Sequence, residues 1–194
     1  LIHEGVRDRA TLSGGRDALR ALGVPDQALV VGNVAQLVDH KDHATLLRAA
    51  ALVLKEQPEC RFVICGDGER LTALLALADE LRIAHRVIFA GFRSDLDALI
   101  PAFDVFCLSS HLEGLGTSVL DAMCFGRAVV ATRAGGIPDS VEDGVTGLIV
   151  PPHDPPALAG AIRALLDDPG RRQALGRAAR ARAVAEFGQA TMLT

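Results

Sequence analysis

The stretch 109–123 holds the residues of this chain that are best placed to do chemistry. Glu113 follows an apolar run and precedes Gly114 and Gly116, and Asp121 comes eight residues later in a segment of helical character. A carboxylate beside the unpaired backbone N–H groups at the start of a helix suits an anionic ligand with many hydroxyl groups, such as a nucleotide sugar. The two glycines either let the backbone approach this ligand closely or form a tight turn.

The acids differ in how well a purely structural role explains them. Ser118 and Asp121 have the spacing of a capping box, and an acid is favourable near the start of any helix. Thr117 and Ser118 also have an ordinary structural role as helix N-caps. Glu113 lies in the loop before the helix and has no capping role, so we interpret it as functional.

A lysine and an aromatic–arginine pair follow two other apolar runs. Lys41 can neutralise a diphosphate as a mobile point charge. Its structural alternative is a solvated residue that opens a helix, where a cation is unfavourable. Phe92 and Arg93 either flank a nucleotide base or cap the hydrophobic core, and the residues alone do not decide between these roles.

Apolar runs of strand length alternate with stretches of helical period, which predicts a parallel sheet covered by helices. The predicted strands span residues 28–34, 61–65, 87–90, 105–108, 128–132 and 146–150. The predicted helices span residues 41–57, 69–81, 96–102, the segment after Glu113 to near Gly126, 156–166 and 171–187.

The fold expected from this alternation is α/β, with a doubly wound, Rossmann-like parallel sheet of six strands and C-terminal helices. We expect residues 1–28 to form a linker and a first helix, residues 29–166 the ligand-binding domain and residues 167–194 a C-terminal helix. Ligands of such sheets bind beyond the carboxyl ends of the strands. The loops that carry Lys41, Arg93 and Glu113 all fall there.

Composition excludes several classes of protein. The chain has 194 residues, 49% of them hydrophobic, and a net charge of −4, which argues against nonspecific nucleic-acid binding. No apolar run approaches the ~20 residues of a membrane span. The four cysteines, which lack CxxC spacing, indicate the reduced thiols of an intracellular protein. The chain opens without Met, which suggests the C-terminal part of a longer protein, although processing or trimming explains this equally well.

Two other motifs do not support a cofactor. Gly66-Asp67-Gly68 begins like a dinucleotide fingerprint, but Leu71 stands where the third glycine belongs. His40 and His43 have a spacing found in metal sites, but no third ligand lies nearby in the sequence. We therefore predict neither an NAD site nor a metal.

The ordered motifs together resemble one known family. The acid–x7–acid signature from Glu113 to Asp121 is followed by Ala122-Met123, a Val-Val-Ala-Thr strand at 129–132, Gly-Gly-Ile-Pro at 135–138 and a similar segment at 142–152. Over about residues 30–164, the chain resembles the C-terminal, donor-binding domain of a retaining, GT-B glycosyltransferase of group 1.

The resemblance implies a role for each matched residue. Glu113 would contact the transferred sugar, and Lys41 would hold the diphosphate. The remaining donor-binding residues implied by the resemblance are Phe92, Arg93, Gly114, Leu115, Gly116, Thr117 and Asp121. The donor would be a nucleotide diphosphate sugar, with UDP or GDP as its nucleotide, and the family needs no catalytic metal.

The resemblance also implies a missing N-terminal domain that holds the acceptor, a cytoplasmic location and contact with a membrane surface through that missing half. Two positions depart from the family pattern: Asp121 replaces the usual Glu, and neutral Gln36 stands where an arginine is common. These departures keep a noncatalytic nucleotide-binding module open as an alternative. A UDP-sugar epimerase of the same architecture is another alternative, and an NAD-linked enzyme is a weaker one.

Overall fold

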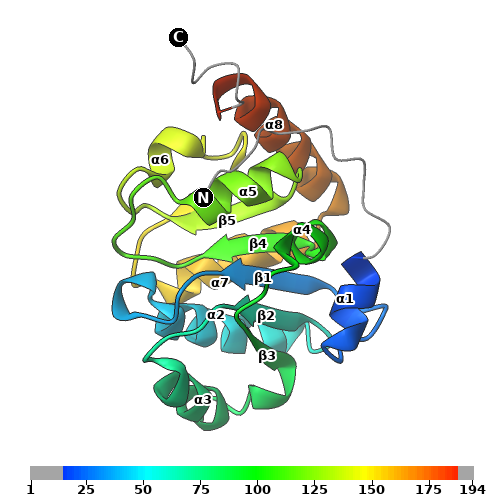
Figure 1. Cartoon of the computed structure of the whole chain (residues 1–194), viewed down its shortest axis with the longest axis vertical. Coiled ribbons are helices and arrows are strands. Elements are labelled where there is room, and N and C mark those ends of the chain that lie inside the picture. The colour runs from blue at the N-terminus through cyan, green and yellow to red at the C-terminus, as the bar shows by residue number, and fades with distance from the viewer. Residues whose placement is uncertain (1–14, 188–194) are drawn as a thin grey trace.

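The computed structural model describes residues 15–187, which form a three-layer α/β domain (Figure 1). One sheet of six strands has the order β3-β2-β1-β4-β5-β6, and every neighbouring pair is parallel. The strands are β1 (Val30–Val34), β2 (Arg61–Cys65), β3 (Val87–Gly91), β4 (Val105–Leu108), β5 (Ala128–Thr132) and β6 (Gly147–Val150). The predicted doubly wound fold is confirmed.

Helices connect the strands and cover both faces of the sheet. The α-helices are α1 (Gly15–Ala21), α2 (His43–Glu56), α3 (Leu71–Glu80), α4 (Leu96–Leu99), α5 (Thr117–Cys124), α6 (Ile137–Ser140), α7 (Pro155–Leu166) and α8 (Pro169–Phe187). Three short 3-10 turns complete the described elements, η1 (Asp39–Lys41), η2 (Ala84–Arg86) and η3 (Ile100–Ala102). The part of the predicted linker that covers residues 1–14 lies outside the described residues, as do residues 188–194.

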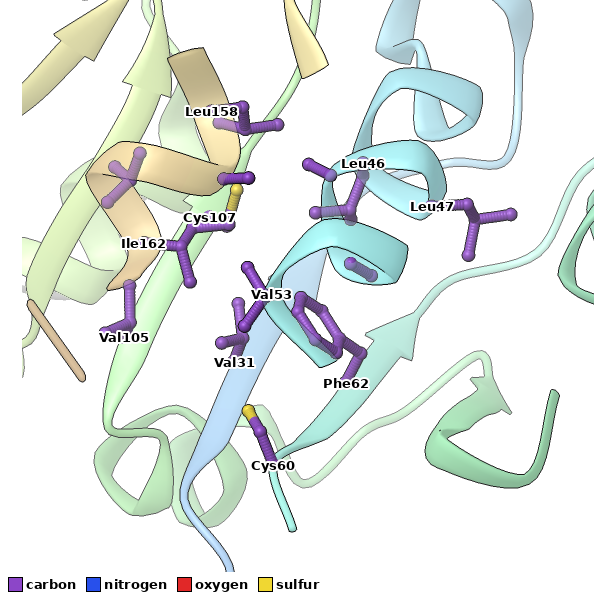
Figure 2. Packing of buried hydrophobic residues seen from close by; sticks show 14 of the residues in the cluster. Val31, Leu46, Leu47, Val53, Cys60, Phe62, Val105, Cys107, Leu158 and Ile162 are labelled. Atoms are coloured by element: carbon purple, nitrogen blue, oxygen red, sulfur yellow. The ribbon is translucent and has the colours of Figure 1, made fainter. Parts of the chain in front are cut away.

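The strands are buried on both faces, which explains their near-continuous apolar sequences. Residues of α2, α3 and α7 pack on one face, where Leu46 and Val53 meet Leu158 and Ile162 above β1 and β4 (Figure 2). Residues of α1, α4 and α5 pack on the other face. Helix α8 supplies Leu175 to the first cluster of buried residues and Ala179 and Ala183 to the second. It therefore joins the two layers at one side of the sheet.

Several predicted boundaries shift by one to three residues, and two of these shifts have a clear local reason. Strand β1 begins at Val30 and not at residue 28, because the Ala28 N–H donates to the Pro25 carbonyl in a turn, 3.0 Å away. Helix α2 begins at His43 and not at residue 41, because the chain first makes the turn η1 and Asp42 then caps the helix. Lys41 thus lies just before the helix, at the carboxyl end of β1.

The strand order places a topological switch between β1 and β4. From β1 the chain proceeds to β2 and β3 on one side, and from β4 to β5 and β6 on the other. The loops after β1 and β4 diverge at this point, and doubly wound sheets bind ligands in the resulting crevice. Among residues 15–187 there is no helix with the length and hydropathy to span a membrane.

Candidate functional site

An ion pair between Lys41 and Glu113 lies at the switch point. The Lys41 Nζ donates to both carboxylate oxygens of Glu113, at 2.8 and 2.6 Å. Only 17% of the Lys41 side chain and 10% of the Glu113 side chain are exposed. The interpretation of Lys41 as a solvated surface residue is therefore wrong. The two residues are 72 positions apart in the sequence, and the tertiary fold brings them together.

The two loops that carry this pair are joined through their backbones. The Ser109 hydroxyl donates to the Lys41 carbonyl, and the His111 N–H donates to the His40 carbonyl. Each donor–acceptor distance is 2.9 Å. Ser109 is fully buried. These bonds hold the loop after β1 against the loop after β4, so Lys41 and Glu113 share one rigid support.

A buried amide and a buried imidazole link β1, β4 and α2 close to these two loops. The Asn33 Nδ2 donates to the Cys107 carbonyl at 2.9 Å, which links β1 to β4. The His43 Nε2 lies 3.1 Å from the Asn33 Oδ1 and links the start of α2 to them. Burial lowers the pKa of His43 to about 4, so the ring is neutral near pH 7 and donates from Nε2. Sequence reasoning missed Asn33, because an asparagine inside an apolar strand carries no recognisable motif.

The Gly-Gly-Ile-Pro turn after β5 supports the Glu113 loop from the other side. The Gly136 N–H donates to the Gly114 carbonyl at 2.9 Å. Gly135 has φ +50°, and a Cβ built there would lie 1.7 Å from the Glu113 carbonyl oxygen. A Cβ on Gly116 would lie 2.3 Å from the Ile137 Cδ1. The two motifs on which the resemblance rested are therefore parts of one packed unit, in which only glycine fits at these contacts.

Helix α5 begins without a side-chain cap. Gly116, with φ 65°, is its N-cap, and no side chain accepts a hydrogen bond from the first turn. The capping roles considered for Ser118 and Asp121 are thus wrong, as is an N-cap role for Thr117, the first residue of the helix. Asp121 lies one turn further along the helix, and partial desolvation raises the pKa of its carboxyl. The first two N–H groups of α5 lack an intrahelical acceptor and lie close to Glu113 in the chain, whereas the third and fourth donate to the Gly116 carbonyl.

Phe92 and Arg93 follow β3, at the edge of the sheet. Phe92 is 78% exposed, so it does not cap the core. Its N–H donates to the Asp67 Oδ2 at 3.0 Å, and this bond gives the Gly66-Asp67-Gly68 motif a structural role. Arg93 donates to both oxygens of Asp95, at 2.8 and 2.6 Å, and this contact lowers the pKa of the Asp95 carboxyl.

The structure therefore brings the predicted residues together to different degrees. Lys41 and Glu113 touch, and Gly114, Leu115, Gly116 and Thr117 continue the same loop into α5. Phe92 and Arg93 follow the edge strand β3, which lies two positions from β1 in the strand order. Gln36, in the loop after β1, is exposed. All these residues lie along the carboxyl edge of the sheet, as predicted.

The comparison with known proteins decides the family. Residues 16–182 match the family described as "Glycosyl transferases group 1". This chain belongs to that family. Its fold is one half of the GT-B fold, and the membership decides against the epimerase and NAD-linked alternatives.

Full-length relatives and solved structures agree with this assignment. The chain is 38% identical over 168 residues to a D-inositol 3-phosphate glycosyltransferase of Corynebacterium diphtheriae, covering 82% of this chain and 39% of that protein. A protein of the same name from Streptomyces avermitilis is 35% identical, with 92% and 41% covered. The chain thus spans about two fifths of the length of the curated relatives it matches.

Among solved structures, Anabaena Alr3699/HepE in complex with UDP-glucose has a TM-score of 0.88 and 30% identity, covering 94% of this chain and 51% of that one. The C-terminal domain of LpcC from Francisella tularensis, a glycosyl transferase group 1 family protein, has a TM-score of 0.85. It is 21% identical, and 96% of this chain covers 99% of it. At this identity the second similarity shows the fold alone. It shows that a separately crystallised domain has the same extent as this chain.

Proposed function

We propose that this chain is the donor-binding half of a retaining glycosyltransferase, and that its substrate is a nucleotide diphosphate sugar bound at the β1–β4 switch point. The observation that carries the proposal is the buried Lys41–Glu113 pair beside the uncapped start of α5. One cation, one carboxylate and several helix N–H groups converge there. This combination matches a ligand that joins an anionic diphosphate to a sugar with many hydroxyl groups.

The charges assign a task to each group. The Lys41 ammonium and the N–H groups at the start of α5 bind the diphosphate and stabilise the negative charge that develops on it as its bond to the sugar breaks. The Glu113 carboxylate accepts hydrogen bonds from hydroxyl groups of the transferred hexose. Binding therefore exchanges the Lys41–Glu113 contact for contacts with the donor.

The rest of the donor extends along the carboxyl edge of the sheet. The exposed Phe92 ring and the backbone at Arg93 meet the base, and Asp121 meets the ribose. Alr3699/HepE, which is 30% identical to this chain, was crystallised with UDP-glucose, and this favours uridine as the base. The acceptor is held by a separate N-terminal domain, which would correspond to the other half of the solved neighbours. The same donor geometry also serves a noncatalytic nucleotide-binding module, and only transfer by the two-domain protein separates the two.

Calorimetric titration with UDP, GDP, ADP and NAD tests the donor site. We expect one of the nucleoside diphosphates to bind with a Kd on the order of 0.1–1 mM. Lys41→Ala should weaken this binding by about tenfold or more, because a charge-assisted contact is worth about 1.5–3 kcal/mol. Lys55→Ala is the matched control, because Lys55 is the only other lysine and is exposed at the end of α2.

A double variant separates two causes of that loss. Removing Lys41 alone leaves the Glu113 carboxylate without its partner, and this charge would repel a diphosphate. Lys41→Ala combined with Glu113→Gln removes that repulsion. Weak binding in both forms supports direct contact with Lys41, whereas recovery in the double variant assigns the loss to Glu113. No binding of any nucleoside diphosphate to the folded chain contradicts the proposal.

A further inference from the structure

Three side chains that the donor site does not use meet beside it. They are Asp42 before α2, His111 in the loop after β4 and His153 in the loop after β6. One ligand atom from each lies within 4.8 Å of the others. The His153 Nδ1 is 2.7 Å from the Asp42 Oδ2, and the His111 and His153 ring centroids are 4.8 Å apart. Three loops from different strands thus place two imidazoles and a carboxylate around one point.

We propose that this cluster binds a zinc ion. Imidazole nitrogens with one carboxylate oxygen are ligands that Zn²⁺ prefers, whereas Mg²⁺ and Ca²⁺ are bound by oxygen atoms alone. Three protein ligands leave one tetrahedral position for water. The inference does not depend on the donor site, because the three residues bind the ion whether or not a nucleotide is bound.

An unsatisfied nitrogen points to a missing ligand. The His111 Nδ1 is buried and has no hydrogen-bond partner. A buried polar atom without a partner is costly, and in native proteins such an atom usually meets a water or an ion. The His111 backbone is held by its bond to the His40 carbonyl, which fixes the position from which the ring extends.

The other two proposed ligands differ in burial and in freedom to rotate. The Asp42 side chain is 11% exposed, and it already caps α2 by accepting from the N–H and the hydroxyl of Thr45. The His153 side chain is 61% exposed, so it can rotate. Tetrahedral zinc needs ligand atoms about 3.3 Å apart at bond lengths of ~2.0–2.1 Å. The His153 Nδ1 is now 2.7 Å from the Asp42 Oδ2, so zinc binding requires this exposed ring to rotate until that distance opens by about 0.6 Å.

Two of the three residues also have an unusual, left-handed backbone conformation. Asp42 and His153 have φ values of 47° and 57°, and among residues 15–187 the only other non-glycine with positive φ is Arg82. Left-handed backbone aims each side chain in a direction that a helix or a strand would not allow. A zinc ion there would join the loops after β1, β4 and β6 next to Lys41 and Glu113.

Titration of the untagged 194-residue chain with Zn²⁺, in a buffer that does not chelate it, tests the site. We expect one ion per chain, a higher melting temperature with Zn²⁺ and no such rise with Mg²⁺. His153→Ala should weaken Zn²⁺ binding by at least ~10²-fold, since even residues that only support metal ligands cost 10–100-fold. His153 is exposed, so this variant should fold as the wild type does.

Two further measurements exclude other sites. His85→Ala is the matched control, because His85 is exposed in η2, before the start of β3 at the opposite edge of the sheet, and should leave Zn²⁺ affinity unchanged. A Co²⁺-substituted sample should lack the charge-transfer absorption of a cobalt–thiolate bond, because the cluster contains no cysteine. Equal affinity in the wild type and His153→Ala, thiolate absorption, or no Zn²⁺ binding by the folded wild type would each overturn the proposal.

Discussion

At the scale of single residues, the site depends on groups that satisfy one another until a ligand arrives. Lys41 and Glu113 neutralise each other in a mostly buried position, where an unpaired charge would be costly. The buried Asn33 and His43 share a hydrogen bond near them, between the Asn33 Oδ1 and the His43 Nε2. The first pair can be tested through turnover of a Glu113 variant. The second can be tested through the dependence of folding stability on pH.

Glu113→Gln should separate binding from turnover. The amide keeps the size of the side chain but removes its charge, so in an intact two-domain enzyme we expect turnover to fall by about 10²-fold or more. Binding of the nucleoside diphosphate should persist or tighten, because Lys41 is released from its partner. Kinetic and calorimetric assays of the same variant give both values, and unchanged turnover would remove Glu113 from the proposed role.

His43 should make the domain sensitive to mild acid. Its pKa is about 4 in the folded domain and ~6.5 in an unfolded chain, so between these values only the unfolded chain binds the proton. Stability from this residue is therefore intact above pH ~6.5 and lost as the pH falls to about 4, by about 3 kcal/mol in total. Denaturant unfolding at several pH values measures this loss.

The matched variants for that experiment are His43→Gln and His85→Gln. His43→Gln removes the titrating group and should flatten the dependence of the unfolding free energy on pH. His85→Gln changes an exposed histidine and should not. Equal slopes in the wild type and His43→Gln would show that His43 does not cause the acid sensitivity.

At the scale of elements, the site is an assembly of loops that support one another. The turn after β5 packs against the backbone of the Glu113 loop, and the loops after β1 and β4 share two hydrogen bonds. Close packing of this kind transmits a small displacement directly to a functional side chain. The glycines at these contacts are therefore as important to the site as the charged residues.

Gly135→Ala tests this support. The new Cβ would meet the Glu113 carbonyl oxygen, so the Glu113 loop must move, and we expect a loss of about 3 kcal/mol or more in stability together with weaker nucleotide binding. Gly144→Ala is the control, because Gly144 also has positive φ, +77°, but open space around its Cβ position. It should lose only the backbone cost of about 1–2 kcal/mol.

Chemical denaturation and calorimetry compare the two glycine variants. If they lose equal stability and bind nucleotide equally well, the contact between the turn and the Glu113 loop is not what positions Glu113.

At the scale of the whole molecule, the described domain is one half of a larger architecture. It covers 51% of Alr3699/HepE and about two fifths of the curated relatives. In the arrangement that we propose, the donor and the acceptor meet between this domain and a second one. A donor site on one of them lacks the groups that hold and orient the acceptor.

We therefore expect the 194-residue chain to bind the donor nucleotide but to transfer little or no sugar by itself. A glycosyl-transfer assay with the isolated chain, run beside the calorimetric titration, measures both properties. Substantial turnover by the chain alone would contradict this expectation and would place the acceptor site within these residues.

Much of this arrangement was predictable from local sequence. The alternation of buried strands and amphipathic helices is set by short-range periodicity, so the parallel sheet and strands such as Arg61–Cys65 and Ala128–Thr132 could be assigned without a structure. Strands of one direction leave their following loops at one edge. The sequence alone therefore placed the loops of Lys41, Arg93 and Glu113 on the same side of the sheet.

Contacts between distant residues were decided only by the tertiary structure. The Lys41–Glu113 pair, the Asn33–His43 link and the cluster of Asp42, His111 and His153 each depend on strand order and side-chain direction. The capping role of Ser118 failed for the same reason, because the packing of Gly116 against Ile137 starts helix α5 elsewhere. Sequence periodicity determines which face of an element is buried, but the geometry of packed loops decides which polar groups meet.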